Sequence, residues 1–449
     1  MPRLNRPVVA CMFDLAHLAL VVAILSPLLA AIIAGSSMLI GSRMPGERTV
    51  VRMLWAGLLS ALLASVFIAT AYATSWPVPL HGEIDFGSWI AIGDYEIPAV
   101  FLVDQYAVAF SLLGAVLTAL VARFSETYLH KDPGFFRFYV LLGLFAAGTQ
   151  LLAFAGSLDL FFAGWEAIGI ASALFIGFFH ERAEPVRSAI RAFTTYRLCD
   201  VAFLIAIVAT HELVGSTRLA DLGRAESLPT LEVSLIAFLL LIAAFGKSAQ
   251  LPFSGWLVRA MEGPTPSSAL FYGGISIHAG LYLLLRTAPV LGMAPGAAIF
   301  GATVGLLTAF YASAVVRTQA DAKGALAQAT LAQIGLILAE ICLGWTTLAL
   351  VHLVTHALLR VWQYLRAPNM LHDAHHHAHH EHRTHAAPAT DTALSRLRRR
   401  LYVEQLHRFR LDDRLDALVA PVLALAHWLQ RIDERWFDRD ERRRTDTEA

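Results

Sequence analysis

The chain has 449 residues, of which 57% are hydrophobic and only 16% are charged. Its 35 Lys and Arg residues balance 35 Asp and Glu residues, so the formal net charge at pH 7 is zero. This composition excludes an ordinary soluble globular protein, in which about 25% of residues are charged. We expect no nucleic-acid partner for such a chain.

The apolar residues are gathered into runs near the ~20-residue length that crosses a bilayer as an α-helix. We therefore predict an all-α fold, a polytopic membrane helix bundle with about eleven transmembrane helices. Hydropathy places them near 16–41, 50–73, 98–121, 138–155, 157–179, 192–211, 232–250, 266–291, 295–316, 325–343 and 346–366.

The loops between these spans alternate in charge. Basic residues gather in every second loop, and the positive-inside rule assigns those loops to the cytoplasm. The protein is then expected in a bacterial inner membrane, with its N-terminus outside and its C-terminus in the cytoplasm. The largest opposite loop, from Ser75 to about Ile97, contains acidic residues but no Lys or Arg, and we expect short strands or turns there.

Two regions flank the predicted core at 98–366. Residues 1–97 hold the first helices and the outer loop. Beyond Arg366 follow a His-rich linker at 367–393 and a basic amphipathic tail at 394–449, helical from about Leu394 to Phe437 and suited to a membrane or partner surface. The linker is either a disordered connection or a segment that buffers metal or senses pH.

Two charged residues lie deep inside predicted spans. Glu166 has apolar neighbours on both sides and no cation within one turn of its own helix, so it needs a partner from another helix. Lys247 precedes Pro252, which is expected to break the seventh span. Burial disfavours the charged form of both group types, which enables them to exchange protons near neutral pH. The alternative is a static ion pair that only orders the bundle.

Further ionisable residues extend this series. His278, Lys323, His352 and His356 are candidates for the same line, and the last two lie four residues apart on one helical face. This spacing also suits a metal site, but no carboxylate or Cys is seen near them, so a proton relay is favoured. Asp200 lies three residues after Arg197. The two are expected to form an ion pair near a helix end, or Asp200 is expected to interact electrostatically with Glu166.

The three cysteines, Cys11, Cys199 and Cys342, are widely separated, so neither a disulfide framework nor a Cys-based metal site is predicted. We expect no cofactor and no redox chemistry in this chain.

Several motifs resemble those of the antiporter-like subunits found in respiratory complex I (subunit L) and in Mrp cation/proton antiporters. They are Gly164-Trp165-Glu166, Arg197-Leu198-Cys199-Asp200, the block from Gly246 to Pro252, the block from Met261 to Leu270, the block from Ala329 to Gly335, and the block from His352 to Ala357. The resemblance covers residues from about 100 to 366. It implies inverted five-helix repeats whose broken helices meet near the membrane midplane.

The resemblance also implies roles for individual residues. Glu166 and Lys247 match the paired charge of the first half-channel, Lys323 the central lysine region, and His352 and His356 the histidines of the eleventh helix. Relatives usually have a histidine where this chain has Tyr272, while His278 is new, which implies a rerouted line. The relatives also have further spans after the eleventh, so the inverted repeats of this chain are expected to be truncated.

The truncated layout, the basic tail and the altered eighth span are similar to the membrane subunit of DAB-type inorganic-carbon accumulation systems. This resemblance implies a proton-conducting subunit, not an enzyme by itself, which drives a large soluble zinc-containing carbonic-anhydrase-like partner on the cytoplasmic face. The zinc is expected in the partner. The alternatives are a proton-pumping subunit of a complex I-like NADH-quinone oxidoreductase and a non-conducting membrane anchor.

Overall fold

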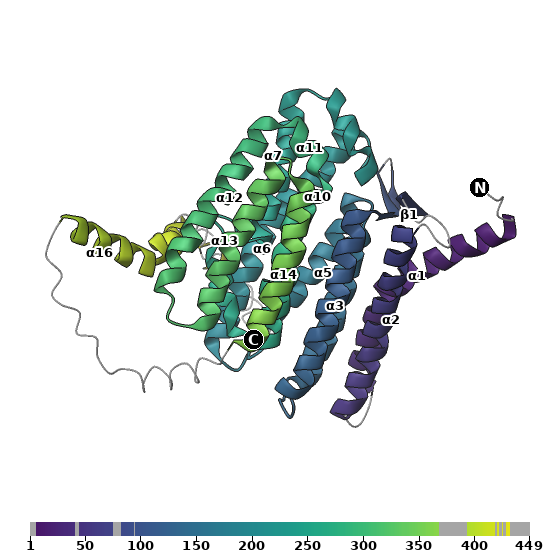
Figure 1. The fold of residues 1–449 in the computed structure, drawn as a ribbon, viewed down its shortest axis with the longest axis horizontal. Coiled ribbons are helices and arrows are strands. Elements are labelled where there is room, and N and C mark those ends of the chain that lie inside the picture. The colour runs from purple at the N-terminus through teal and green to yellow at the C-terminus, as the bar shows by residue number, and fades with distance from the viewer. Residues whose placement is uncertain are drawn as a thin grey trace, which may run out of the picture. The chain divides into compact units, whose positions relative to one another are not determined.

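Eleven helices in the described part of the chain are long and apolar enough to cross a membrane, which confirms the predicted number and the helical fold class. The computed structural model describes residues 6–40, 45–74, 82–93, 95–367, 393–417, 420–421, 424 and 428–431. Ten of the spans are built on single long helices (Figure 1): α1 (Arg6–Ile40), α2 (Glu47–Thr74), α3 (Gln105–Tyr128), α4 (Phe135–Phe154), α5 (Leu158–Ile176), α6 (Ala183–Val214), α7 (Thr230–Lys247), α12 (Pro295–Val315), α13 (Ala322–Cys342) and α14 (Thr346–Arg366).

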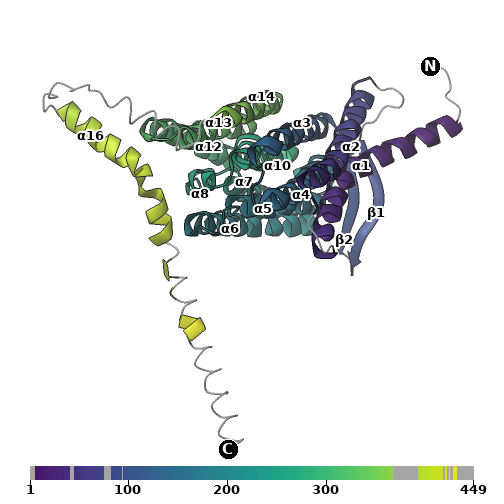
Figure 2. The ribbon, with the colours of Figure 1, turned by 90° about the horizontal axis from the view of Figure 1, so that it is seen from below.

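The remaining span, Thr265–Arg286, is broken into short pieces and lies at the centre of the bundle. It consists of α9 (Thr265–Ser268), a π-helical turn η3 (Ala269–Gly274), a 3₁₀ turn η4 (Ser276–His278) and α10 (Ala279–Arg286). Its most apolar window is completely buried, whereas several outer helices bury less than half of theirs. Figure 2, which looks along the bundle, shows α10 surrounded by other helices.

The connections between helices fall at two ends of the bundle. The chain segments 155–157, 215–229, 287–294 and 343–345 lie at the end that carries a β-hairpin, which we call the hairpin face. Most basic loop residues, among them Lys131, Arg182 and Arg259, lie at the opposite end, the basic face. Two polar contacts agree with this division. Arg286 forms an ion pair with Asp104 at the hairpin face, and His130 contacts Glu47 at the basic face.

The hairpin consists of β1 (Gly82–Ile92) and β2 (Tyr95–Val103), which pair antiparallel and confirm the predicted short strands. The predicted start of a helix at residue 98 is wrong. The apolar run from 98 to 103 belongs to β2, and helix α3 begins only after Asp104, whose carboxylate caps it by accepting from the Ala107 amide. The strand and the helix adjoin in sequence and are both apolar, so hydropathy does not separate them.

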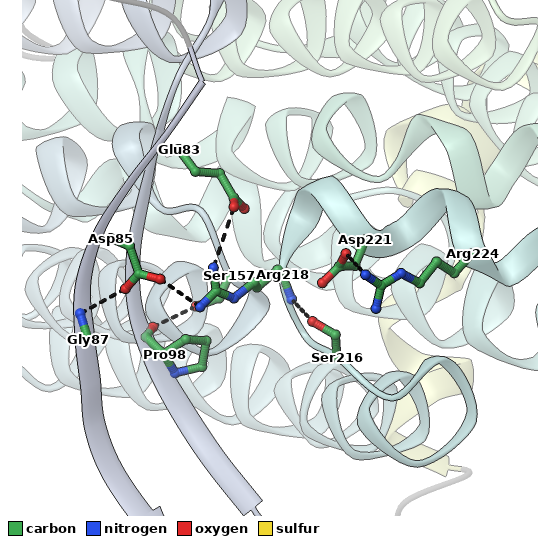
Figure 3. A network of polar contacts seen from close by, with 9 residues as sticks. All are labelled: Glu83, Asp85, Gly87, Pro98, Ser157, Ser216, Arg218, Asp221 and Arg224. Carbon is green, nitrogen blue, oxygen red and sulfur yellow. Dashed lines mark hydrogen bonds and ion pairs between the residues drawn. The ribbon is translucent and has the colours of Figure 1, made fainter.

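Arg218, from the segment between α6 and α7, fastens the hairpin to the bundle (Figure 3). It contacts the carboxylates of Glu83 at 3.5 Å and Asp85 at 2.8 Å. The Gly87 amide and then Arg218 donate to Asp85 and lower the pKa of its carboxyl group. The backbone also pairs here, because Ser157 bridges to Arg218 and Phe101 to Ala155. The starts of α3 and α5 are therefore held at fixed positions.

Helix α7 ends at Lys247, so the predicted break in the seventh span is confirmed, although it comes five residues before Pro252. Ala249 has a φ of +52°, a left-handed conformation that turns the chain out of the helix. The chain then resumes as α8 (Gly255–Arg259), followed by η2 (Ala260–Glu262). The hydroxyl of Ser248 donates to the Ile277 carbonyl at 2.7 Å and ties this break to the broken central span.

The C-terminal residues from 383 onward form a separate unit. Within it, α16 (Ala393–Leu406) confirms the start of the predicted tail helix. Leu397, Leu401 and Leu406 are exposed beside several arginines, as expected for an amphipathic surface helix. The His-rich segment at 368–392 lies outside the described residues, as do Leu418, Val422 and Leu425 of the predicted tail helix.

Candidate functional site

A cluster of charges lies where α5, α6 and α7 meet. Arg197 of α6 contacts Glu166 of α5 at 2.5 Å and Asp200 of its own helix at 2.7 Å. The other oxygen of Asp200 accepts from the indole N–H of Trp165 at 2.5 Å. Asp200 is almost fully buried, and a buried carboxylate requires this neutralisation because isolated ions are costly away from water. The partner that Glu166 needs is thus Arg197.

Arg197 and Asp200 were expected to form an ion pair near a helix end. The pair is confirmed, but the position is wrong, because α6 extends from Ala183 to Val214 and the pair lies in its middle. The helix begins well before the apolar run, in a stretch that contains Arg187 and Arg191, which hydropathy alone counts as loop. This central position makes the pair costly to bury and makes it a candidate functional pair.

Lys247, the last residue of α7, completes the cluster. Its ammonium group donates to the carbonyl of Trp165 at 3.0 Å and lies 4.7 Å from the Trp165 ring and 4.9 Å from the Tyr196 ring. Gly169 makes room for it, since a Cβ there would lie 2.7 Å from the lysine nitrogen. Within the described residues Lys247 has no direct carboxylate partner, so the expected Glu166–Lys247 pair is indirect.

The formal charges of this group cancel. Two cations, Arg197 and Lys247, face two carboxylates, Glu166 and Asp200, and the lysine feels both carboxylates electrostatically. Lys247 is held by a carbonyl and two aromatic faces instead of a carboxylate. Such contacts stabilise an ammonium group less firmly than a direct buried ion pair. The arrangement makes Lys247 a candidate proton-exchanging group.

A second group joins the broken central span to α14. His278 and His356, 78 residues apart, share a hydrogen bond of 3.0 Å between Nε2 and Nδ1. Arg360 donates through Nε to the other nitrogen of His356 at 3.1 Å, and His278 bonds the Gly274 carbonyl through Nδ1. Arg360 can only donate, so a neutral His356 must carry its proton on Nδ1 and donate to His278. His278 then donates to the Gly274 carbonyl, so each group from Arg360 to His278 donates a hydrogen bond to the next one.

His352, one turn before His356, faces a carboxylate that the sequence analysis missed. Its Nδ1 lies 2.9 and 3.2 Å from the two oxygens of Glu340, and its Nε2 lies 3.0 Å from Gln333. The expectation that no carboxylate accompanies these histidines is therefore wrong. Glu340 lies only three residues before the end of the predicted tenth span at 325–343, so the rule applied to Glu166, which concerns charges deep inside a span, does not single it out. The described residues contain no group of three or more metal-ligating side chains.

Tyr272 is linked to the Lys247 group through two aromatic contacts. Its ring packs on Trp256 with 5.7 Å between centroids, and Trp256 packs on Tyr196 at 4.9 Å. Both tyrosine hydroxyls are buried and find no hydrogen-bond partner among the described protein atoms. The same holds for the hydroxyls of Ser254 and Ser268. Buried polar groups without a protein partner are typically bonded to water, so this stretch is suited to hydration.

Lys323 is not brought to either group. It is the second residue of α13, at the basic face, and its electrostatic partners are Asp321 and Glu262. No contact between Lys323 and Lys247 or the histidines occurs in the described part of the chain. Of the residues predicted for the line, Glu166, Asp200 and Lys247 form one group and His278, His352 and His356 form another. Tyr272 is joined to the first group through Trp256 and Tyr196.

Charged side chains at broken helices in the middle of a polytopic bundle define a membrane protein of the ion-transporter type. Two family models match the chain: "NADH:quinone oxidoreductase/Mrp antiporter, TM" over residues 155–386, and the N-terminal region of complex I chain 5 over residues 89–139. The chain belongs to this family of antiporter-like membrane subunits.

Individual relatives agree with this assignment. The chain is 31% identical over 327 residues to NAD(P)H-quinone oxidoreductase chain 5 of Picosynechococcus sp., which covers 70% of this chain and 49% of the relative. It is 32% identical over 291 residues to NADH-quinone oxidoreductase subunit L of Mycobacterium tuberculosis. That match covers 64% of this chain and 46% of the relative. The chain thus spans about half the length of these relatives.

Two solved structures are similar in fold. A chain of the Mrp complex from Dietzia sp. matches with a TM-score of 0.63 and 26% identity over 79% of this chain and 37% of that chain. A chain of a membrane-bound sulfane sulfur reductase, an archaeal respiratory complex, matches with a TM-score of 0.65 over 78% of this chain and 70% of that chain. At 19% identity, the second likeness concerns the fold alone.

The charge cluster predicts a specific loss of stability. Replacing Arg197 by Gln leaves Asp200 buried without its cation, which should cost about 1–3 kcal/mol. We expect a lower melting temperature in detergent, and partial recovery in the double variant Arg197→Gln/Asp200→Asn. The matched control is Arg187→Gln in the same helix, whose pair with Glu184 is exposed and contributes little. Equal melting temperatures for the two single variants would contradict the proposed charge balance.

Proposed function

We propose that this chain is a proton-conducting membrane subunit. The observation that supports this most strongly is the pair of titratable groups at broken helices: Lys247 beside two carboxylates, and His278 bonded to His356. The buried hydroxyls of Tyr196, beside Lys247, and of Tyr272 have no protein partner among the described residues and suit a hydrated connection toward the histidines. Protons would pass along this line between the hairpin face and the basic face, the basic face being cytoplasmic by the positive-inside rule.

Inward proton flow can supply energy to a partner. We propose that the chain belongs to an energy-coupled inorganic-carbon uptake complex of a bacterial inner membrane, in which protons drive a soluble zinc-containing carbonic-anhydrase-like subunit. The resemblance to DAB-type membrane subunits supports this assignment, as do His278 in the central span and the basic tail helix α16. The chain itself would bind no zinc, and the basic face and tail would receive the partner.

A second candidate is a proton-pumping subunit of a complex I-like NADH-quinone oxidoreductase. The names of the relatives favour it, and so does the surface of α6. Arg197 lies in the middle of that membrane helix but leaves 36% of its side chain exposed. Two nitrogens of its guanidinium are buried, but any polar part of the side chain left exposed at this depth is costly in lipid. A neighbouring membrane subunit against α6 would cover it.

Conduction is tested by proton flux in proteoliposomes that contain the full chain with its co-purifying subunits. Lys247→Met removes a proton-exchanging group from the line, and we expect flux driven by an imposed potential to fall by about 100-fold, as for loss of a general acid–base group. The control is Lys131→Met, the same change at an exposed loop position of the basic face. Wild-type flux in both variants would instead support the non-conducting anchor.

The coupled process is tested by what co-purifies with the chain in mild detergent. A single large zinc protein on the basic face supports inorganic-carbon uptake, and the isolated complex should then accumulate bicarbonate in liposomes until an uncoupler is added. Quinone-reducing subunits in its place would support the second candidate. An intact zinc-containing complex without uncoupler-sensitive accumulation contradicts the first proposal.

A further inference from the structure

The histidine line ends near the hairpin face at a carboxylate. Glu340 lies two residues before the end of α13, and α13 runs from the basic face to the hairpin face. His352 follows six residues after the start of α14, which begins at the hairpin face. With a rise of about 1.5 Å per residue, Glu340 is within about 3 Å of its helix end and His352 about 9 Å from the start of its own.

The two outer groups of this line are more exposed than the two histidines nearer the centre of the bundle. The side chains of Glu340 and His352 keep 17% and 23% of their surface exposed. His356 keeps 5% and His278 none. Glu340 and His352 therefore reach the surface of the described chain, while the His278 imidazole does not. Protons could be exchanged with the surroundings only at the exposed end of such a series.

The contacts of His352 fit a transfer step. When the ring is neutral with its proton on Nε2, it donates to the Gln333 amide oxygen, and Nδ1 is free to accept. A protonated Glu340, 2.9 Å away, can then pass its proton to Nδ1, which leaves a carboxylate and an imidazolium. The His356 ring lies next along the line, with 6.2 Å between centroids, a separation that a bridging water can span. Its Nε2 can take up the proton only when Arg360 releases that nitrogen.

We propose that Glu340 is the proton port of the hairpin face, where protons enter or leave the line through His352 toward His356 and His278. This inference rests on the proposed proton conduction and adds the residue at which the line opens to one side. The alternative is a static pair in which Glu340 only orients His352. That pair would be satisfied equally well by an uncharged acceptor.

The experiment measures potential-driven proton flux in proteoliposomes of the full chain carrying Glu340→Gln. Glutamine keeps an acceptor for His352 but cannot carry a proton, so we expect flux to fall at least about tenfold with an unchanged melting temperature. Glu340→Asp should retain measurable flux, because it keeps a titratable carboxyl group. His352→Gln, the second variant, should lose flux as well. The matched control is Glu212→Gln, an exposed carboxylate near the hairpin-face end of α6, which should leave flux unchanged.

The outcomes separate the two proposals. Wild-type flux no greater than that of empty liposomes contradicts the proposed conduction and the port together. Normal wild-type flux that persists in Glu340→Gln contradicts the port alone. If Glu340→Gln lowers the melting temperature, the proton flux of Glu340→Asp and that of His352→Gln are compared with the wild-type flux in its place. Wild-type proton flux in both of these variants would then contradict the proposal that Glu340 is a proton port.

Discussion

Burial of charge inside the bundle is the constraint on which the rest of the structure depends. Arg197 lies between Glu166 and Asp200, and the two carboxylates with Arg197 and Lys247 sum to zero formal charge. None of these groups can be removed singly without leaving an uncompensated ion away from water. Helices α5, α6 and α7 must therefore meet at this position. The fully buried Trp165 reinforces the junction, since its indole binds Asp200 and its carbonyl binds Lys247.

The breaks in two spans follow from the same need to satisfy polar groups away from water. Where a helix ends inside a membrane, its free carbonyls and amides require partners. In this chain the end of α7 provides such a partner for the broken central span, because the Ser248 hydroxyl donates to the Ile277 carbonyl. The π-helical turn η3 presents the Gly274 carbonyl to His278, which fixes that ring against His356. The breaks thus position both titratable groups.

Much of this arrangement could be predicted from the sequence, for identifiable reasons. Apolar run length predicts the eleven spans because bilayer thickness sets helix length. Glu166, Lys247, His352 and His356 stand out because charged or titratable residues are rare within such runs. Inorganic-carbon coupling, the zinc partner and the membrane orientation remain predictions, because they depend on molecules outside this chain.

Contacts between distant segments could not be predicted. No periodicity links His278 to His356, and nothing local shows that Glu166 pairs with Arg197 while Lys247 takes a carbonyl. Two errors arose at run ends. The apolar strand at 98–103 was read as helix because it adjoins α3, and Glu340 was passed over because it lies near the end of its span. Side chains near span ends are where hydropathy is least informative and where a conducting line must open.

The central claim is that a hydrated line joins the Lys247 cluster to the histidines through the stretch around Tyr196 and Tyr272. An experimental density map of the intact complex in lipid, at a resolution that shows ordered water, tests it most directly. We expect waters within hydrogen-bonding distance of both tyrosine hydroxyls, in a chain that reaches Lys247 and His278. A dry stretch, with both hydroxyls bonded to protein atoms and no water between the two groups, would contradict it.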